Sequence, residues 1–175
     1  KRLDELKGTD VLNELNTLHT EGVEFVEPAD LSGAIRGRHN LYTHLETMIK
    51  GATKSVSIMT TNKGILRKAE ALRNELEKLK KKGVKIRIAA PVSKETLDAN
   101  PHIAKFAEVR SVKGINARFV IVDGKELMFM VLDDEDVHPT YDVGIWVNTP
   151  YFATAMDELF NHVWKAASAA PVASK

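Results

Sequence analysis

The sequence contains no cysteine among its 175 residues, which excludes disulfide bonds and thiolate metal sites and is compatible with a reducing compartment. No apolar run approaches the roughly 20 residues that a membrane helix needs, and no secretory signal is visible. Neither sign of charge is in excess, because 25 Lys and Arg face 24 Asp and Glu, for a formal net charge of +1. Global charge therefore gives no argument for nucleic-acid binding. We expect a cytoplasmic protein without membrane contact.

Common catalytic and cofactor motifs are also missing. The chain has no GxGxxG, Walker A or GxSxG sequence, so nucleotide-binding and serine-hydrolase functions have no support. No HExxH occurs, and the histidines are scattered; they are His19, His39, His44, His102, His138 and His162. We expect no cofactor and no bound metal, with histidines in surface or capping positions. The exception we single out is His138, because the neighbouring carboxylates favour its protonated form.

The composition that is present suits one globular domain, with 43% hydrophobic and 28% charged residues. Apolar residues at helical spacing predict four long helices, at residues 1–22, 40–51, 63–82 and 150–166. Thr9 is a candidate N-cap within the first, and Thr149 and Pro150 open the last. The first helix has two interpretations: a lid on the core, or half of a helix pair between subunits.

The middle of the chain reads as strand, helix, strand. Residues 55–60 form a short β-rich segment, the helix at 63–82 follows, and alternating residues 84–89 predict a second strand after a helix-terminating Gly83. Such a βαβ unit has parallel strands and a right-handed crossover. Further strands are expected at residues 108–112, 118–122, 127–131 and 143–147, with Asp123-Gly124 as a hairpin turn. Residues 22–37 read as a connector.

The predicted helix at 63–82 and the strand after it are strongly basic. Ten Lys or Arg and three Glu lie between Lys63 and Arg87. One interpretation is a phosphate-contacting patch; the other, which we favour, is a solvated helix face whose last lysines suit the negative end of the helix dipole. No aromatic residues are interleaved, so stacking on bases is not supported.

One segment carries a resemblance to a known superfamily. The run Asn116-Ala117-Arg118-Phe119-Val120-Ile121-Val122-Asp123-Gly124 resembles the strand and turn that carry the HxKxxxxD motif of phospholipase-D-like proteins. The spacing is kept, but Asn116 and Arg118 replace the His and the Lys. Asp123 suits a turn residue before Gly124. The Gly-Ser-x-Asn segment that normally follows reads Met130, Val131, Leu132 and Asp133 here.

Residues 35–165 resemble, more closely, the C-terminal domain of TrmB-family transcriptional regulators, which carry a DNA-binding winged helix and a helical linker before a degenerate phospholipase-D-like domain. The matching stretches are residues 45–49 with 52–56, the Lys-Gly-Val-Lys-Ile run, residues 118–123 and residues 142–147. The resemblance implies an α/β fold: one phospholipase-D-like half, with a mixed β-sheet flanked by helices and an N-terminal helix before it. We divide the chain into a linker or dimerisation helix with its connector (1–34), a regulatory domain (35–167) and a flexible tail (168–175).

The resemblance also implies a function. The family's chemistry needs a histidine nucleophile, a role that the amide of Asn116 cannot fill, so we expect a non-catalytic domain that senses an effector and forms a homodimer. DNA would be bound by a winged helix that is not in this chain. The expected site for a small polar or anionic effector lies at the remnant of the old active site, formed by Thr60, Thr61, Asn62, Asn116, Arg118, Asp133 and Asp142. A competing interpretation has residues 60–62 only cap the next helix, with Asn62 as a good N-cap. The alternative functions are a residual phosphodiesterase or nuclease and a ligand-free oligomerisation scaffold.

Overall fold

The computed structural model describes residues 10–21 and 27–169. The chain forms two compact units, and the boundary between them in the sequence lies after Leu31. The described part of the first unit contains two helices, α2 (Asp10–Glu21) and α3 (Pro28–Leu31), and α2 exposes the apolar side chains of Val11, Leu12 and Leu15. The cap predicted at Thr9 lies outside the described residues. The second unit, from Ser32 onward, holds the sheet.

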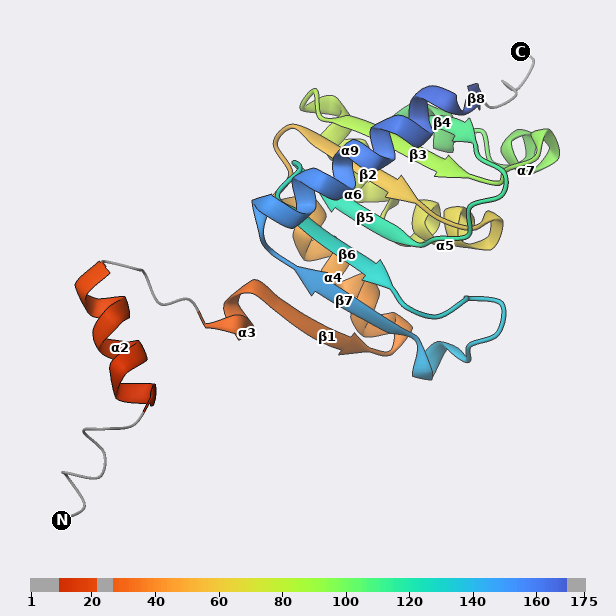
Figure 1. The fold of residues 1–175 in the computed structure, drawn as a ribbon. Helices are drawn as coiled ribbons and strands as arrows, with labels where there is room; N and C mark the ends of the chain where they lie inside the picture. The colour runs from red at the N-terminus through yellow and green to blue at the C-terminus, as the bar shows by residue number, and fades with distance from the viewer. Residues whose placement is uncertain (1–9, 22–26, 170–175) are drawn as a thin grey trace. The chain divides into compact units, whose positions relative to one another are not determined.

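Eight strands of the described residues form one mixed sheet in the order β1-β7-β6-β5-β2-β3-β4-β8 (Figure 1). The neighbours β2–β3 and β3–β4 are parallel, as the predicted βαβ unit requires, and the other pairs are antiparallel. The strands are β1 (Ser32–Arg36), β2 (Ser55–Met59), β3 (Lys85–Ala90), β4 (Glu108–Ser111), β5 (Phe119–Val122), β6 (Glu126–Met130), β7 (Val143–Val147) and β8 (Ser168–Ala169).

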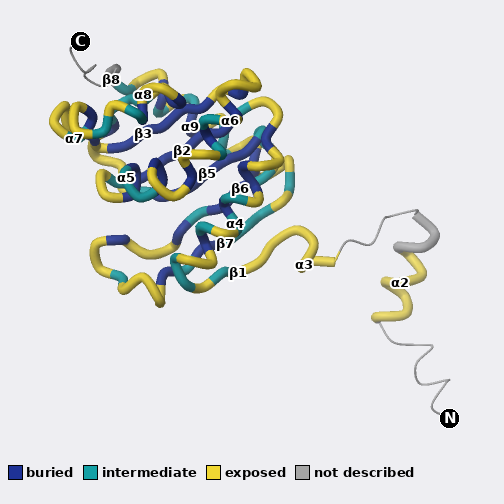
Figure 2. Tube along the Cα trace, turned by 180° about the vertical axis from the view of Figure 1, so that it is seen from behind, coloured by how far each residue is buried: buried dark blue, intermediate teal, exposed yellow. Residues whose placement is uncertain are grey.

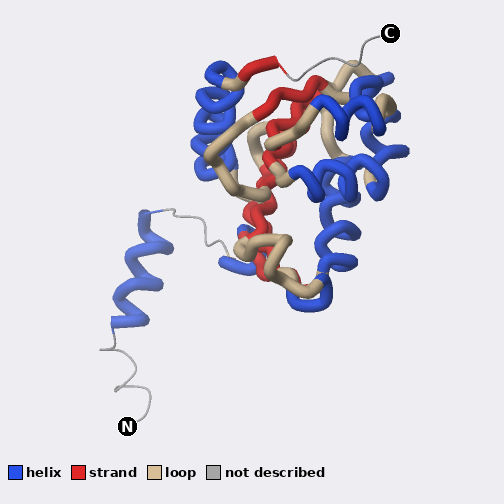
Figure 3. Tube along the Cα trace, turned by 90° about the vertical axis from the view of Figure 1, so that its right-hand side faces the viewer, coloured by secondary structure: helices blue, strands red, loops and turns tan. Residues whose placement is uncertain are grey.

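Helices cover both faces of this sheet, which Figure 3 shows nearly edge-on. The larger core lies under the helices on one face; they are α4 (Arg38–Lys50), α5 (Asn62–Ala71), α6 (Arg73–Lys81), α7 (Lys94–Ala99) and α8 (Ile103–Phe106). On the other face α9 (Pro150–Ala166) packs Ala153, Phe160 and Trp164 onto β2, β5 and β6. A short helix, η1 (Pro139–Tyr141), precedes β7. Figure 2 shows the buried central strands and the exposed edge strand β1.

Two predicted turns form as the sequence indicates. Gly83 has φ +83°, and backbone bonds from Gly83 N to Lys80 O (3.1 Å) and from Val84 N to Leu79 O (3.0 Å) close the end of α6. Asp123 and Gly124 have φ values of 55° and 65°, which suits the tight turn joining β5 to β6. Both glycines therefore occupy backbone positions that most side chains disfavour.

Three sequence expectations were wrong in part. The connector predicted over residues 22–37 includes α3 and the strand β1, which pairs with β7 and starts before the boundary that we placed at residue 35. The single helix predicted over 63–82 is divided at Leu72 into α5 and α6. The tail from residue 168 begins with β8, which pairs with β4. The segments β1 and β8 are strands because each pairs with a neighbouring strand, and local sequence does not show such pairing.

The basic segment is only partly a solvated face. Lys68 and Arg87 are buried at 2% and 9% exposure. Arg87 lies beneath α9, where its guanidinium donates to Asn161 Oδ1 (2.8 Å) and Ser57 Oγ (3.0 Å). Its Cζ is also 4.9 Å from the ring centroid of Phe160.

Candidate functional site

A buried ion pair occupies the position where the phospholipase-D-like motif would have its lysine. Arg118, just before β5, donates from Nη2 to Asp142 Oδ1 (2.8 Å) and from Nη1 to Asp142 Oδ2 (3.0 Å), and also donates to the carbonyl of Leu132. Exposure is only 6% for Arg118 and 1% for Asp142. Two parallel bonds between a guanidinium and a carboxylate fix both groups in direction as well as distance.

A second arginine shares this carboxylate. Arg38, the first residue of α4, donates from Nε to Asp142 Oδ2 at 3.1 Å. Burial acts to raise the pKa of Asp142, but the hydrogen bonds and charges of Arg118 and Arg38 outweigh it, so this pKa lies below its usual value. The carboxylate is therefore ionised at neutral pH and joins the starts of β5, β7 and α4.

A second carboxylate lies on the loop after β6. Asp134, 7% exposed, accepts a hydrogen bond from Thr61 Oγ1 (2.7 Å) and pairs with Arg67 of α5. Burial acts to raise the pKa of Asp134, but the hydrogen bonds of Thr61 and Arg67 and the charge of Arg67 outweigh it, so this pKa lies below its usual value. Thr61 also caps α5, because its hydroxyl accepts from Gly64 N at 2.9 Å. The loop is thereby held against the start of α5.

A buried lysine completes what we call the ion cluster: Arg38, Arg67, Lys68, Arg118, Asp134 and Asp142. The Lys68 Nζ donates to Thr60 Oγ1 at 3.1 Å and lies 5.7 Å from the ring centroid of Tyr42. Burial, together with the positive charges of Arg118 and Arg67, lowers the pKa of Lys68 to about 7. Near neutral pH this amine is thus divided between its two protonation states.

The ion cluster has more donors than acceptors among the described residues. Four basic side chains face two carboxylates. The donors Arg38 Nη2, Arg67 Nε and Arg118 Nε are buried without a hydrogen-bond partner, as is one acceptor, Asp134 Oδ1. Unpaired buried donors are costly, so native structures normally satisfy them with protein, water or ligand. The arrangement is suited to an additional small group that carries acceptor oxygens.

A small cavity of about 150 Å³ opens beside the cluster. Its walls come from the residues before β5, the end of β6 and the following loop; they are Thr61, Asn116, Ala117, Arg118, Met130, Val131, Leu132 and Asp133. We call it the Asn116 cavity. Its volume admits a group of a few atoms, and none of these lining residues is a histidine. General acid–base chemistry by imidazole therefore has no source in this lining.

The structure brings together most of the residues predicted for the site. Arg118 bonds to Asp142, Thr61 to Asp134 and Thr60 to Lys68, all within the ion cluster and its hydroxyl partners, whereas Asn116 and Asp133 are exposed and line the cavity. Asn62 lies outside both, because it is the exposed first residue of α5. The interpretation that residues 60–62 cap the next helix is confirmed at Thr61, but the N-cap is not Asn62.

Sequence reasoning missed Arg38, Arg67, Lys68 and Asp134. One signal was readable for Lys68, which lies three residues after Ile65 and four before Leu72 and so shares their buried face. No comparable signal marks Arg38 or Asp134, because their partners are far away in the sequence.

Asp123, the third motif residue, has a structural role. Its carboxylate accepts backbone hydrogen bonds from Lys54 N (2.7 Å), Ser55 N (2.9 Å) and Thr53 N (2.9 Å). Burial raises the pKa of Asp123, but these bonds lower it more, so it is ionised and holds the start of β2. His138 likewise serves as a cap, since its Nδ1 accepts from Thr140 N at 3.2 Å.

No group of three or more His, Cys, Asp or Glu side chains in the described part of the chain is arranged to hold a metal ion. No described helix is long and apolar enough to span a membrane.

Comparisons with known proteins agree with this geometry. The family described as "Transcriptional regulator TrmB, EBD N-terminal subdomain" matches residues 33–170. The fold is similar to that of TrmBL2, an archaeal chromatin protein whose structure is described as showing a novel mode of DNA binding; identity is 18% and the TM-score 0.62, over 96% of this chain and 65% of that one. This chain thus spans about two thirds of TrmBL2.

Two further solved structures share the fold at similar scores. Nuc from Salmonella typhimurium, a phospholipase D family member, is 15% identical with a TM-score of 0.61, over 79% of this chain and 97% of that one. NucT from Helicobacter pylori is 14% identical with a TM-score of 0.61, over 79% and 98%. At such identities the likeness shows the fold alone. No curated protein matches the chain in sequence.

Proposed function

Because the chain belongs to the TrmB family of transcriptional regulators, we propose that it senses an effector and dimerises without catalysing phosphodiester hydrolysis. The observation that carries this proposal is that Arg118 is buried and hydrogen-bonded to Asp142. A cation that stabilises a transferring phosphoryl group must face the substrate, whereas Arg118 is 6% exposed and makes two bonds to Asp142. DNA would be bound by a winged helix outside these 175 residues, in a cytoplasmic protein.

The proposed effector is a small polar or anionic molecule in the Asn116 cavity. Asn116 and Thr61 offer an amide and a hydroxyl, and the neighbouring guanidinium nitrogens without acceptors favour a group with oxygen acceptors. A ligand here would act on Asp142 and Asp134 and so on the starts of α4 and α5. Effector binding and helix position would thereby be linked.

A thermal-shift screen of phosphate, sulfate, sugar phosphates and neutral sugars tests the proposal. We expect at least one stabilising ligand, whose effect grows with concentration by mass action. Asn116→Ala should weaken its apparent affinity about three- to tenfold, because one hydrogen bond contributes roughly 0.5–1.5 kcal/mol. Asn74→Ala, at an exposed position of α6, is the matched control and should change nothing.

Three outcomes would contradict parts of this proposal. Absence of any stabilising ligand favours an oligomerisation scaffold. Equal loss of affinity, or none, in both variants places the ligand elsewhere. Turnover of a phosphodiester substrate that Asn116→Ala abolishes would make the protein an enzyme.

The proposed dimer uses the surface around the Asn116 cavity, with or without α2. Two apolar side chains there are exposed, Val131 at 51% and Leu132 at 44%. They adjoin half-buried Phe129, whose cross-strand partner Ile145 is half-buried on the same sheet face. Apolar side chains gathered at one place are typical of an interface, and a two-fold dimer uses the same patch on both copies. Sedimentation at tens of micromolar is the direct measurement.

A further inference from the structure

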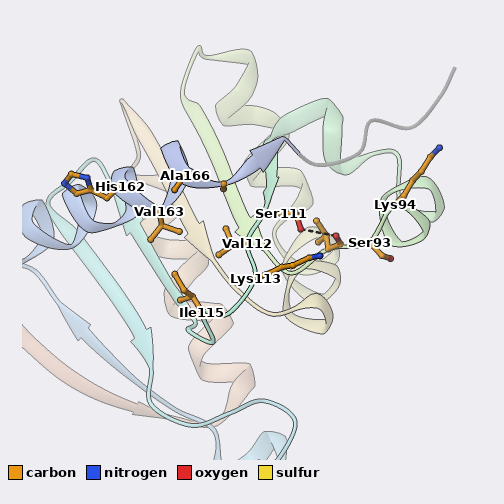
Figure 4. A pocket seen from close by; sticks show the side chains of 11 residues that line it. Ser93, Lys94, Ser111, Val112, Lys113, Ile115, His162, Val163 and Ala166 are labelled. Carbon is orange, nitrogen blue, oxygen red and sulfur yellow. Dashed lines mark hydrogen bonds between the residues drawn. The ribbon is translucent and has the colours of Figure 1, made fainter.

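A larger hollow, which we call the α9 groove, lies beside the last turns of α9 (Figure 4). Its volume is about 810 Å³, within the range of roughly 300–1,000 Å³ that small-molecule sites occupy. Its walls come from the segment after β3, the end of β4 with the segment after it, and the end of α9; they are Val92, Ser93, Lys94, Ser111, Val112, Lys113, Ile115, His162, Val163, Ala166 and Ala167. Since β3 and β4 are parallel neighbours, the groove lies at the carboxyl ends of strands, where open α/β sheets commonly bind ligands.

The floor of the α9 groove is apolar. Val92 and Val112 are buried beneath it, and Ile115 and Val163 contribute partly exposed apolar surface. In Figure 4 the side chains of Val112 and Ile115, from the segment after β4, and of Val163, from α9, point toward a common space. Burying a methylene group on such a surface contributes about 0.8 kcal/mol, so a ligand with an apolar body would gain most from this floor.

The charge of the groove has one sign. No Asp or Glu lines it, whereas Lys94 and Lys113 do. Within the described part of the chain, neither lysine has an ion-pair partner, unlike Lys63 and Lys78, which pair with glutamates. Lys113 extends from the loop after β4 toward Ser93, while Lys94 points outward at the rim (Figure 4).

We propose that the α9 groove binds a small organic anion, with an apolar body of about eight carbons against Val112, Ile115 and Val163 and a carboxylate near Lys113. The apolar floor selects for the body, and the unpaired cations select for the anionic head over a neutral or positive one. The chemistry does not separate a medium-chain fatty acid from an aromatic acid, so both belong to the test. This proposal is independent of the one made for the Asn116 cavity.

Amide chemical-shift titration of the full chain is the experiment. Octanoate and 1-naphthoate are the anionic probes, and octanol and octylamine keep the octyl body while changing the head group. We expect octanoate or 1-naphthoate to bind at millimolar concentration or tighter, with shifts concentrated at Val112, Ile115 and Val163. Octanol should bind at least about fivefold more weakly than octanoate, and octylamine should not bind.

Matched variants locate the anionic head. Lys113→Glu should weaken binding roughly tenfold, because it replaces attraction by repulsion at a partly exposed site. Lys85→Glu, at another exposed lysine, at the start of β3, should leave binding unchanged. The proposal is overturned if neither anion binds, if octanol binds as tightly as octanoate, if the shifts lie elsewhere, or if both lysine variants behave alike.

Discussion

At the scale of single residues, Lys68 sets a pH dependence that an exposed lysine would not. Its pKa falls from the usual 10.5 to about 7 in the folded chain because burial penalises the charged amine. Between these two values the unfolded chain holds a proton that the folded chain has released. Stability therefore rises with pH across this interval, by at most about 1.4 kcal/mol per pH unit. Below pH 7 both states are protonated, and the full penalty for the buried charge applies.

Lys68→Met should remove this contribution. We expect the variant to unfold at a higher denaturant concentration than the parent chain near pH 7, with a flatter dependence between pH 7 and pH 10. Lys85→Met, at an exposed position, is the control and should keep the parent slope. Denaturant unfolding at several pH values measures both effects. An identical slope for the parent and Lys68→Met would show that the buried amine keeps its ordinary affinity for protons.

The residues of the candidate site were predictable to different degrees. Motif spacing located Asn116, Arg118 and Asp123, since the spacing depends on one strand and one turn. It did not predict that Arg118 would be locked to Asp142, because that contact depends on how β7 follows β6 in the sheet. Asp142 had been expected only as one contributor to the site, and its role as the shared partner of two arginines came from the three-dimensional arrangement.

At the scale of elements, the close approach of α4 to β7 depends on a glycine. A Cβ placed on Gly144 would lie 2.3 Å from Leu41 Cδ2, whereas a Cβ on Gly33 in the adjacent strand β1 would be 3.9 Å from its nearest neighbour, Trp146. Leu41 is fully buried and has little room to move. Gly144 is thus required for packing and Gly33 is not.

Gly144→Ala should lower the free energy of unfolding by about 1–3 kcal/mol, the usual cost of overpacking a core. Gly33→Ala, in a strand of the same sheet, should change it by less than about 1 kcal/mol. Chemical denaturation of the two variants side by side is the measurement. Equal destabilisation would mean that backbone conformation, and not the contact with Leu41, decides the cost.

The elements also show why sequence patterns succeed or fail. Residues 84–89 alternate between apolar and basic, so β3 was predicted, and Asp123-Gly124 defined the hairpin of β5 and β6. In contrast, β1 begins Ser32-Gly33-Ala34, without the β-branched or aromatic residues that favour strands. Its five residues are strand because β7 offers them hydrogen-bonding partners. Such a tertiary effect is invisible in a local pattern.

At the scale of the whole molecule, the proposed dimer gives a prediction about assembly. Val131→Lys and Leu132→Lys each place a charge within the apolar patch around the Asn116 cavity, and burying an unpaired charge in an interface is costly. We expect either variant to sediment as a monomer at concentrations where the parent chain is a dimer. Leu159→Lys, on α9 and 58% exposed, is the control. A monomeric parent chain, or a dimer in all four proteins, would contradict this interface.

The register of β1 on β7 and the Arg38–Asp142 ion pair depend on each other. The chain enters the sheet at Ser32, and five residues later Gly37 donates its backbone N–H to Asp142 O (2.7 Å), while Arg38 holds the Asp142 carboxylate. An edge strand that slips along its partner must move by two residues to keep its faces, which is roughly 7 Å at the usual rise. That step is more than twice the 3.1 Å between Arg38 Nε and Asp142 Oδ2. The Arg38–Asp142 ion pair is therefore compatible with the present register of β1 on β7 and not with a register shifted by two residues.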